Sequence, residues 1–229
     1  MKKIDHLVCV SCGKKYDVEE ILYVCPDCGL DKGTLDVVYD YDGIRSRFSR
    51  DDLKASGEFS QWRYWEILPV TRREFVPPLR IGWTPLYRAD RLERQLGLNH
   101  LWLKDDTCNP SASLKDRASV MAAVRARELG RDIVTGASTG NAATSMSCVS
   151  AYMGIKPYIF VPERAPKAKV AQLLVYGATV IMVRGSYDQC FGLCWEAGER
   201  WGWYSRNTAI NPFLSEGKKT AALEICEQL

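Results

Sequence analysis

From residue 101 onward, short apolar segments typical of strands alternate with longer segments typical of helices. This alternation, with short connections, predicts an α/β fold in which a mostly parallel open sheet is flanked by helices. The expected strands are 101–104, 132–135, 156–161, 178–183 and 203–206, and the expected helices are 114–129, 140–153, 165–176, 186–201 and 215–229. Ligands of such sheets bind where the carboxyl ends of strands lead into helices.

Four of the nine cysteines form two pairs, Cys9-x-x-Cys12 and Cys25-x-x-Cys28, and a glycine follows each pair. Two such knuckles supply the four thiolates of a closed tetrahedral zinc site. The short segment between the pairs is too small to hold a fold without a metal. A redox-active pair is the competing interpretation, whereas haem attachment would need His after the second cysteine. The pattern predicts a structural zinc ribbon over residues 1–40.

The charge pattern bears on possible partners of the chain. The formal net charge is +3 and the basic residues are scattered, which argues against a nucleic-acid partner. Residues 133–155 carry no charge but are rich in Gly, Ser, Thr and Asn, unlike a membrane span. Because no signal peptide is visible either, we expect a cytoplasmic protein with no membrane partner. Residues 41–80 form a mixed connector before the α/β body of residues 81–229.

The segment N109-P-S-A-S-L-K-D-R117 places a lysine where a helix begins. Ser113 and Asp116 have the spacing of a capping box, which predicts a helix start near Leu114. Lys115 then lies in the first helical turn, where the macrodipole disfavours a cation. An amine held neutral there suits Schiff-base chemistry. A surface lysine in a mediocre position is the alternative, and local sequence alone favours it.

A second loop, T135-G-A-S-T-G-N141, lies between an expected strand and an expected helix. Its small residues let backbone N–H groups converge on a carboxylate or small phosphate at the helix N-terminus. A plain tight turn explains the same residues equally well. The loop is not a dinucleotide fingerprint, and residues 215–220 do not form a nucleotide phosphate loop.

Together these segments resemble the threonine synthase family of pyridoxal-phosphate enzymes, which have the tryptophan synthase β-like fold. N109-P-S-A-S-L-K-D-R117 is similar to the family's N-P-T-G-S-F-K-D-R segment, and A137-S-T-G-N141 to its A-S-T-G-N loop. G82-W-T-P-L86 resembles the upstream G-x-T-P-L stretch, and residues 166–178 and 211–220 resemble further family segments. The resemblance runs from about residue 80 to residue 229, and members of the family can carry an N-terminal cysteine ribbon.

The resemblance implies roles for five residues. Lys115 would hold pyridoxal phosphate covalently and then move protons, and Asn141 would hydrogen-bond the ring hydroxyl of the cofactor. Ser138, Thr139 and Gly140 would receive the substrate carboxylate. The implied reaction eliminates phosphate from O-phosphohomoserine and adds water to give threonine, with the cofactor as electron sink.

Several positions depart from the family pattern. Leu114 replaces Phe, Ser111-Ala112 replaces Thr-Gly, and Ala118 replaces Gly. The segment after Asn211-Pro212 lacks the family arginine that helps to bind the substrate phosphate. A related enzyme acting on another amino acid, such as a cysteate synthase or an ammonia-lyase, is therefore the alternative.

Residues 1–229 contain no glycine-rich loop of the kind that holds the cofactor phosphate in this family. The resemblance thus implies an incomplete fold that lacks a C-terminal part, and we expect such a chain to form homo-oligomers. From a different functional class, a zinc-ribbon module that binds nucleic acid or protein is the competing interpretation.

Overall fold

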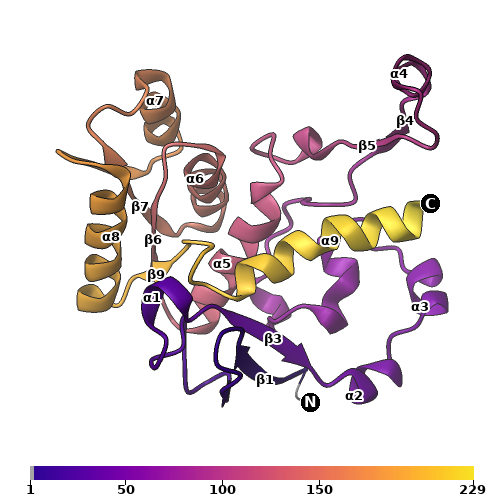
Figure 1. Ribbon diagram of the computed structural model, residues 1–229, viewed down its shortest axis with the longest axis horizontal. Helices are drawn as coiled ribbons and strands as arrows, with labels where there is room; N and C mark the ends of the chain where they lie inside the picture. The colour runs from indigo at the N-terminus through magenta and orange to yellow at the C-terminus, as the bar shows by residue number, and fades with distance from the viewer. Residues whose placement is uncertain (1–2) are drawn as a thin grey trace.

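The computed structural model describes residues 3–229 of the protein. Its first part is a small antiparallel sheet of order β2-β1-β3, in which Leu7 pairs with Tyr16 on one side and with Val37 on the other. The elements of this part are β1 (Ile4–Cys9), β2 (Lys15–Tyr16), α1 (Gly29–Lys32) and β3 (Leu35–Tyr39). This part, which we call the ribbon, lies at the lower edge of the molecule in Figure 1.

The ribbon shares its small apolar core with the main body. Leu7, Tyr16, Leu35 and Tyr39 are buried in that core together with Phe213. Phe213 is the first residue of the last helix, α9 (Phe213–Gln228). The ribbon therefore buries its apolar side chains against a residue that lies far away in the sequence.

The connector, residues 41–80, packs against the body. It contains the short helices α2 (Tyr41–Arg45), α3 (Arg50–Ala55), η1 (Gln61–Ile67) and η2 (Arg73–Phe75). Trp62, Tyr64 and Trp65 of η1 are buried in the same core cluster as the residues of α5 (Lys115–Glu128). Arg63 extends from the same helix and hydrogen-bonds the carboxylate of Glu227 on α9. The aromatic side chains of η1 are thus part of the main core.

The predicted parallel sheet is confirmed, with strand order β8-β7-β6-β9 and all pairs parallel. Its strands are β6 (Ile133–Ala137), β7 (Lys156–Pro162), β8 (Thr179–Val183) and β9 (Tyr204–Ser205), and the helices between them are α6 (Asn141–Met153), α7 (Lys167–Val175) and α8 (Tyr187–Trp201). Phe160 packs with α8 residues, whereas Ile159 and Val161 pack with residues of α6 and α7. Because alternate side chains of a strand point to opposite faces, helices cover both faces of this sheet (Figure 1).

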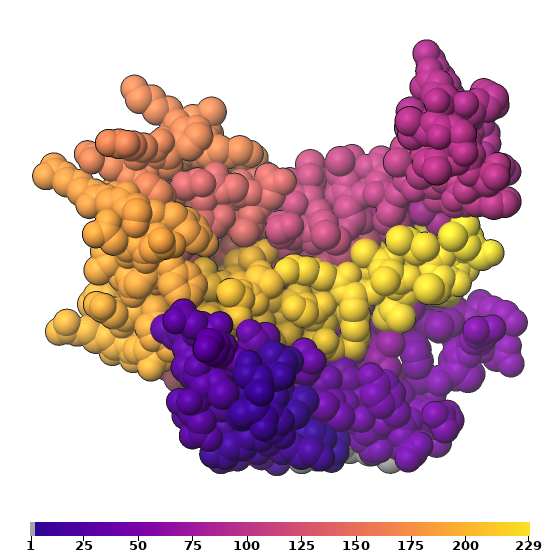
Figure 2. Space-filling model, viewed as in Figure 1, coloured from indigo at the N-terminus to yellow at the C-terminus, as the bar shows by residue number. Residues whose placement is uncertain are grey.

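The expected strand at 101–104 forms, but its predicted place in the parallel sheet is wrong. This strand, β5 (Trp102–Lys104), pairs antiparallel with β4 (Leu86–Arg88). With α4 (Asp90–Leu96) between them, they form an arm that projects from the body in Figure 2. A short apolar run predicts a strand but carries no information on the strand with which it pairs. The turn η3 (Asp106–Cys108) then leads from the arm back to α5.

Helices α5 and α9 cross in close contact at Gly217. A Cβ atom at this position would lie 2.2 Å from the carbonyl oxygen of Arg117 on α5, so only glycine allows this crossing. Helix α9 begins at Phe213, two residues before the expected start, and runs across the body toward the arm (Figure 1). No helix among residues 3–229 is long and apolar enough to span a bilayer.

Arg117 is fully buried and joins three parts of the chain. Its guanidinium pairs with Asp106 at 2.8 Å and with Glu224 of α9, and it donates to the hydroxyl of Thr220 at 2.9 Å. Lys104 of the arm pairs with the same Glu224 at 2.8 Å. The Arg of the K-D-R motif is therefore a structural cation that holds α5 to α9 and to the arm.

Candidate active site

The candidate site lies where the strand order of the parallel sheet reverses. Strand β6 has its successor β7 on one side and the last strand, β9, on the other. Ligands of open α/β sheets bind in the crevice beside such a switch point, at the carboxyl ends of the strands. Ser138 directly follows β6 and Arg206 directly follows β9. Both line one pocket of about 190 Å³, together with Asn207 and Thr208.

Lys115 is the first residue of α5 and is half-buried. Its Nζ atom makes no hydrogen bond or ion pair with residues 3–229, whereas its backbone N–H donates to the hydroxyl of Ser113 at 3.2 Å. A lysine without a partner at a helix N-terminus has an amine available for chemistry. This position fits the role that the resemblance implies for Lys115.

The predicted capping box before α5 is wrong. The N-cap residue is Leu114, and no side chain caps the helix. The Asp116 carboxylate accepts the backbone N–H of Ser111 at 2.7 Å instead. Ala112 has φ 55°, and this left-handed conformation reverses the chain between Ser111 and Asp116. Ser111 is thereby brought back over the helix. Asp116 therefore shapes the loop before Lys115.

The loop from Ser138 to Asn141 joins β6 to α6. The Ser138 hydroxyl accepts the Gly140 N–H at 3.2 Å, and Gly140 is the N-cap residue of α6. The backbone N–H groups of Thr139 and Asn141 have no acceptor among residues 3–229. Asn141 begins the helix with an exposed side chain. Unpaired N–H groups at a helix N-terminus form a suitable receptor for an anion such as a carboxylate.

Arg206 connects this loop to Lys115. The side chain is 4% exposed and lines the pocket that contains Ser138. Its guanidinium donates to the Lys115 carbonyl oxygen at 3.5 Å, to the Ser119 hydroxyl at 3.2 Å and to the Thr208 hydroxyl at 3.1 Å. It has no carboxylate partner within ion-pair distance among residues 3–229. Buried charges are usually paired, so the pocket contains a cation without a matching anion.

Lys218 on α9 adds a further positive charge near Arg206. Burial, and then the charges of Arg206 and Lys115, lower the pKa of the Lys218 amine to about 8. Burial lowers the pKa of Arg206 to about 10, against the opposing charge of Asp116. Lys218 has no ion-pair partner in the described part of the chain. We call Arg206 and Lys218, the two basic side chains beside Lys115, the cation cluster.

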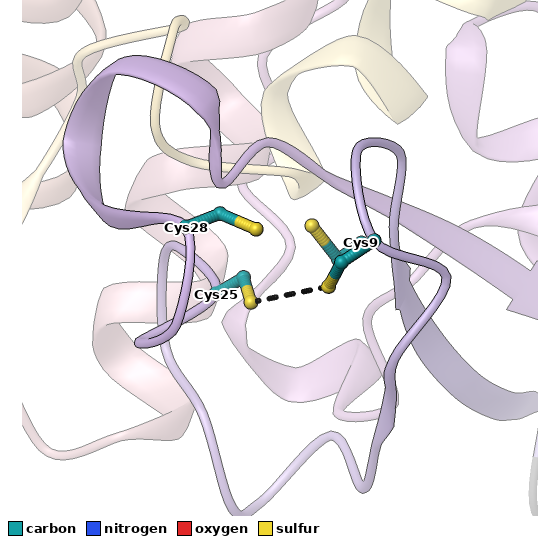
Figure 3. A group of neighbouring side chains, drawn as sticks. Cys9, Cys25 and Cys28 are labelled. Carbon is teal, nitrogen blue, oxygen red and sulfur yellow. Dashed lines mark hydrogen bonds between the residues drawn. The ribbon is translucent and has the colours of Figure 1, made fainter.

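The four ribbon cysteines also come together. Their sulfur atoms lie within 4.8 Å of one another, and the Cys12 and Cys25 sulfurs are 3.8 Å apart. Figure 3 shows the sulfurs of Cys9, Cys25 and Cys28 directed toward one common space. The Tyr16 hydroxyl lies 3.0 Å from the Cys25 sulfur, and this hydrogen bond lowers the pKa of the Cys25 thiol to about 6. The cysteines are free thiols arranged as a set of metal ligands.

Sequence reasoning missed Arg206 and Lys218 as site residues. Arg206 appeared as the last residue of an expected strand, and Lys218 as part of a rejected phosphate-loop pattern. One signal could have identified Arg206, because it directly follows a strand at the end of the sheet where ligands bind. No comparable signal existed for Lys218, since its place depends on how α9 crosses α5.

Comparisons with known proteins agree with this geometry. Residues 78–229 match the family described as "Pyridoxal-phosphate dependent enzyme". Threonine synthase from Methanocaldococcus jannaschii is 42% identical over 222 residues, which cover 96% of this chain and 53% of that protein. Threonine synthase from Methanosarcina acetivorans is 37% identical over 98% of this chain and 53% of its own length. The chain thus spans about half the length of these curated relatives.

A solved structure supports the fold. The processed form of threonine deaminase isoform 2 from Solanum lycopersicum has a TM-score of 0.59 and 21% sequence identity to this chain. The similarity covers 83% of this chain and 49% of the tomato protein. The predicted α/β fold, of the type seen in pyridoxal-phosphate enzymes, is therefore confirmed.

Proposed function

Because the chain belongs to the family of pyridoxal-phosphate-dependent enzymes, we propose that it acts in threonine synthesis, with O-phosphohomoserine as substrate. The cation cluster is the observation that carries this choice of substrate. O-phosphohomoserine has a carboxylate at one end and a dianionic phosphate at the other, and the site has a separate receptor for each anion. The threonine synthase relatives support the same choice.

Two residues are suited to hold the cofactor. Lys115 offers an unpartnered amine at the start of α5, and Asn141 presents an exposed amide at the start of α6. The absence of a side-chain partner for Lys115 is the structural feature that fits covalent attachment. When bound, pyridoxal phosphate supplies the electron sink for the reaction. Lys115 would hold the cofactor, and the Lys115 Nζ atom, once free of it, would be placed to move protons.

The remaining residues bind and orient the substrate. The unpaired N–H groups of Thr139 and Asn141, in the loop that also contains Ser138 and Gly140, receive the carboxylate. Arg206 and Lys218 receive the phosphate and stabilise the negative charge on this group as its bond to carbon breaks. They take the place of the family arginine that the segment after Asn211-Pro212 lacks. Water then adds to give threonine, and inorganic phosphate leaves.

The proposal is tested by incubating the full-length enzyme with pyridoxal phosphate and O-phosphohomoserine. We expect threonine and inorganic phosphate in equal amounts, without release of ammonia. The Lys218→Met enzyme should show a KM for this substrate about tenfold higher, because one charge-assisted hydrogen bond to the phosphate is lost. Ammonia release, or turnover only of substrates without phosphate, would favour the ammonia-lyase alternative instead.

Because Lys218 lies near Arg206, its pKa predicts that anion binding at Arg206 depends on pH. Lys218 is a cation below about pH 8 and neutral above it. Affinity for sulfate, which keeps its charge in this range, should therefore fall up to about tenfold between pH 7 and pH 9. Calorimetry on cofactor-free protein measures this change, and Lys218→Met should remove it. Lys54→Met, which removes an exposed lysine of α3, is the charge-matched control and should behave like the wild type.

We further propose that the four ribbon cysteines bind one structural zinc ion per chain. Metal analysis of protein purified without chelator should find one zinc, and the Cys9→Ser protein should contain much less. Hydrogen exchange of residues 4–39 should then accelerate, while β6 and β7 stay protected because the sheet has its own core. Cys108→Ser, an exposed cysteine outside the cluster, should retain the zinc. Wild-type protein without zinc would refute the assignment.

A further inference from the structure

The loop between β9 and α9, which carries Arg206, Asn207 and Thr208, is held in place by contacts with the ribbon. At its start, the backbone N–H of Ser205 donates to the hydroxyl of Tyr23 at 2.8 Å. Beyond its end, the Tyr39 hydroxyl donates to the carboxylate of Glu216 at 2.5 Å. Between these points, residues 34–37 and 208–212 line the same small cavity of about 50 Å³. The ribbon thus contacts this loop at its start, along its length and beyond its end.

Tyr23 lies deep in the contact between the ribbon and the body. It is 8% exposed, and its ring packs against Trp195 and Tyr204 at centroid distances of 5.7 and 5.8 Å. It precedes Cys25 by two residues, in a segment that has no helix or strand. The position of Tyr23 therefore depends on the cysteine knuckle beside it and on its packing, not on local secondary structure.

The hydrogen bond from Ser205 to Tyr23 also affects the next residue in the chain, Arg206. Ser205 is fixed at both polar backbone atoms, because its carbonyl oxygen accepts from the Asn211 side chain at 2.8 Å. The next residue, Arg206, enters the pocket with its backbone N–H bonded to the Thr135 carbonyl at 2.7 Å. Buried N–H groups left without a partner are costly, so loss of the Tyr23 hydroxyl would shift or loosen this turn.

We propose that Tyr23 is a positioning residue, through which the ribbon fixes the direction of Arg206 and so the geometry of the anion pocket. Tyr23 touches neither substrate nor cofactor and acts only through Ser205. The effect on anion binding rests on the proposed function, whereas the coupling between ribbon and loop does not. The ribbon is then more than a support for folding, because it holds the loop whose residues Arg206, Asn207 and Thr208 line the pocket.

Hydrogen exchange of the Tyr23→Phe protein tests the coupling. Phenylalanine keeps the ring packing and removes only the acceptor oxygen. We expect the amides of Arg206, Ile210 and Asn211 to exchange about 5- to 30-fold faster. These amides are bonded to acceptors other than Tyr23, so a purely local role for Tyr23 would leave them unchanged. Tyr64→Phe, which removes a buried hydroxyl bonded to Glu227, is the matched control and should leave these amides unaffected.

A second readout connects the coupling to the site. The Tyr23→Phe protein should bind sulfate about 5- to 30-fold more weakly than the wild type, and the Tyr64→Phe protein should bind it normally. Equal exchange of the Arg206 to Asn211 amides in both variants would overturn the proposal. If the wild type fails to bind sulfate, the phosphate pocket is wrong, and the exchange experiment alone still decides the role of Tyr23.

Discussion

Replacement of Lys115 by alanine is expected to abolish the covalent capture of pyridoxal phosphate. Lys115 offers an unpartnered amine at the first turn of α5, close to the pocket between β6 and β9. Reduction with borohydride followed by mass spectrometry of peptides should find the cofactor on Lys115 in the wild type and on no lysine in the variant. Lys169→Ala, a lysine on α7, should retain the full adduct. An adduct at another lysine would overturn the assignment.

Lys115→Arg separates the covalent role of this residue from its charge. Arginine stays protonated in proteins and cannot attack a carbonyl, so the adduct should be lost here as well. The proposed phosphate ligands Arg206 and Lys218 are unchanged, so sulfate affinity should stay within about twofold of the wild type. Loss of both properties would mean that the substitution disturbs the loop itself.

Replacement of Arg117 by methionine is expected to destabilise the fold by about 3–5 kcal/mol. Arg117 and Glu224 have fully buried side chains, and Asp106 is only 13% exposed, so the variant leaves two carboxylates in the core without this cation. Lys104 still pairs with Glu224, but it also donates to the Thr84 carbonyl oxygen and makes no ion pair with Asp106 among residues 3–229. The loss should appear as a lower denaturant midpoint in urea unfolding.

An exposed ion pair provides the control for this experiment. Arg45 and Asp42 lie 3.8 Å apart with side chains 81% and 96% exposed. Arg45→Met removes the same charge but should change stability by no more than about 0.5 kcal/mol. An effect of Arg117→Met as small as this would show that the buried network contributes little.

The helices and strands of the α/β body were predictable because local sequence patterns determine most of them. The strands and helices after residue 130 appear within two or three residues of their expected bounds, since each apolar run is long enough to identify its type. The predictions that were wrong concern which polar group or which strand pairs with which. Ser113 and Asp116 have the spacing of a capping box, but the positive φ of Ala112 brings Ser111 to the carboxylate first. The strand at 101–104 forms, yet it pairs with β4.

Only those residues of the candidate site that lie within a sequence motif were predictable. Lys115 and the loop from Ser138 to Asn141 could be found because each lies within a recognisable segment of the sequence. Arg206 reaches Lys115 from 91 residues away, and Lys218 approaches them because Gly217 lets α9 cross close to α5. Such contacts depend on the packing of whole elements, which no local pattern encodes.

The contact of Phe213 with the ribbon core also has a consequence for synthesis of the protein in the cell. The ribbon strands leave the ribosome before the other described elements, and the helix that completes their core is the last of those elements to be made. At about 5–20 residues per second, the ribbon waits roughly 10 to 35 seconds for Phe213 to emerge. During this time its apolar side chains are open to chaperones and to neighbouring nascent chains. A zinc ion bound early would keep the nascent ribbon folded until its partner helix arrives.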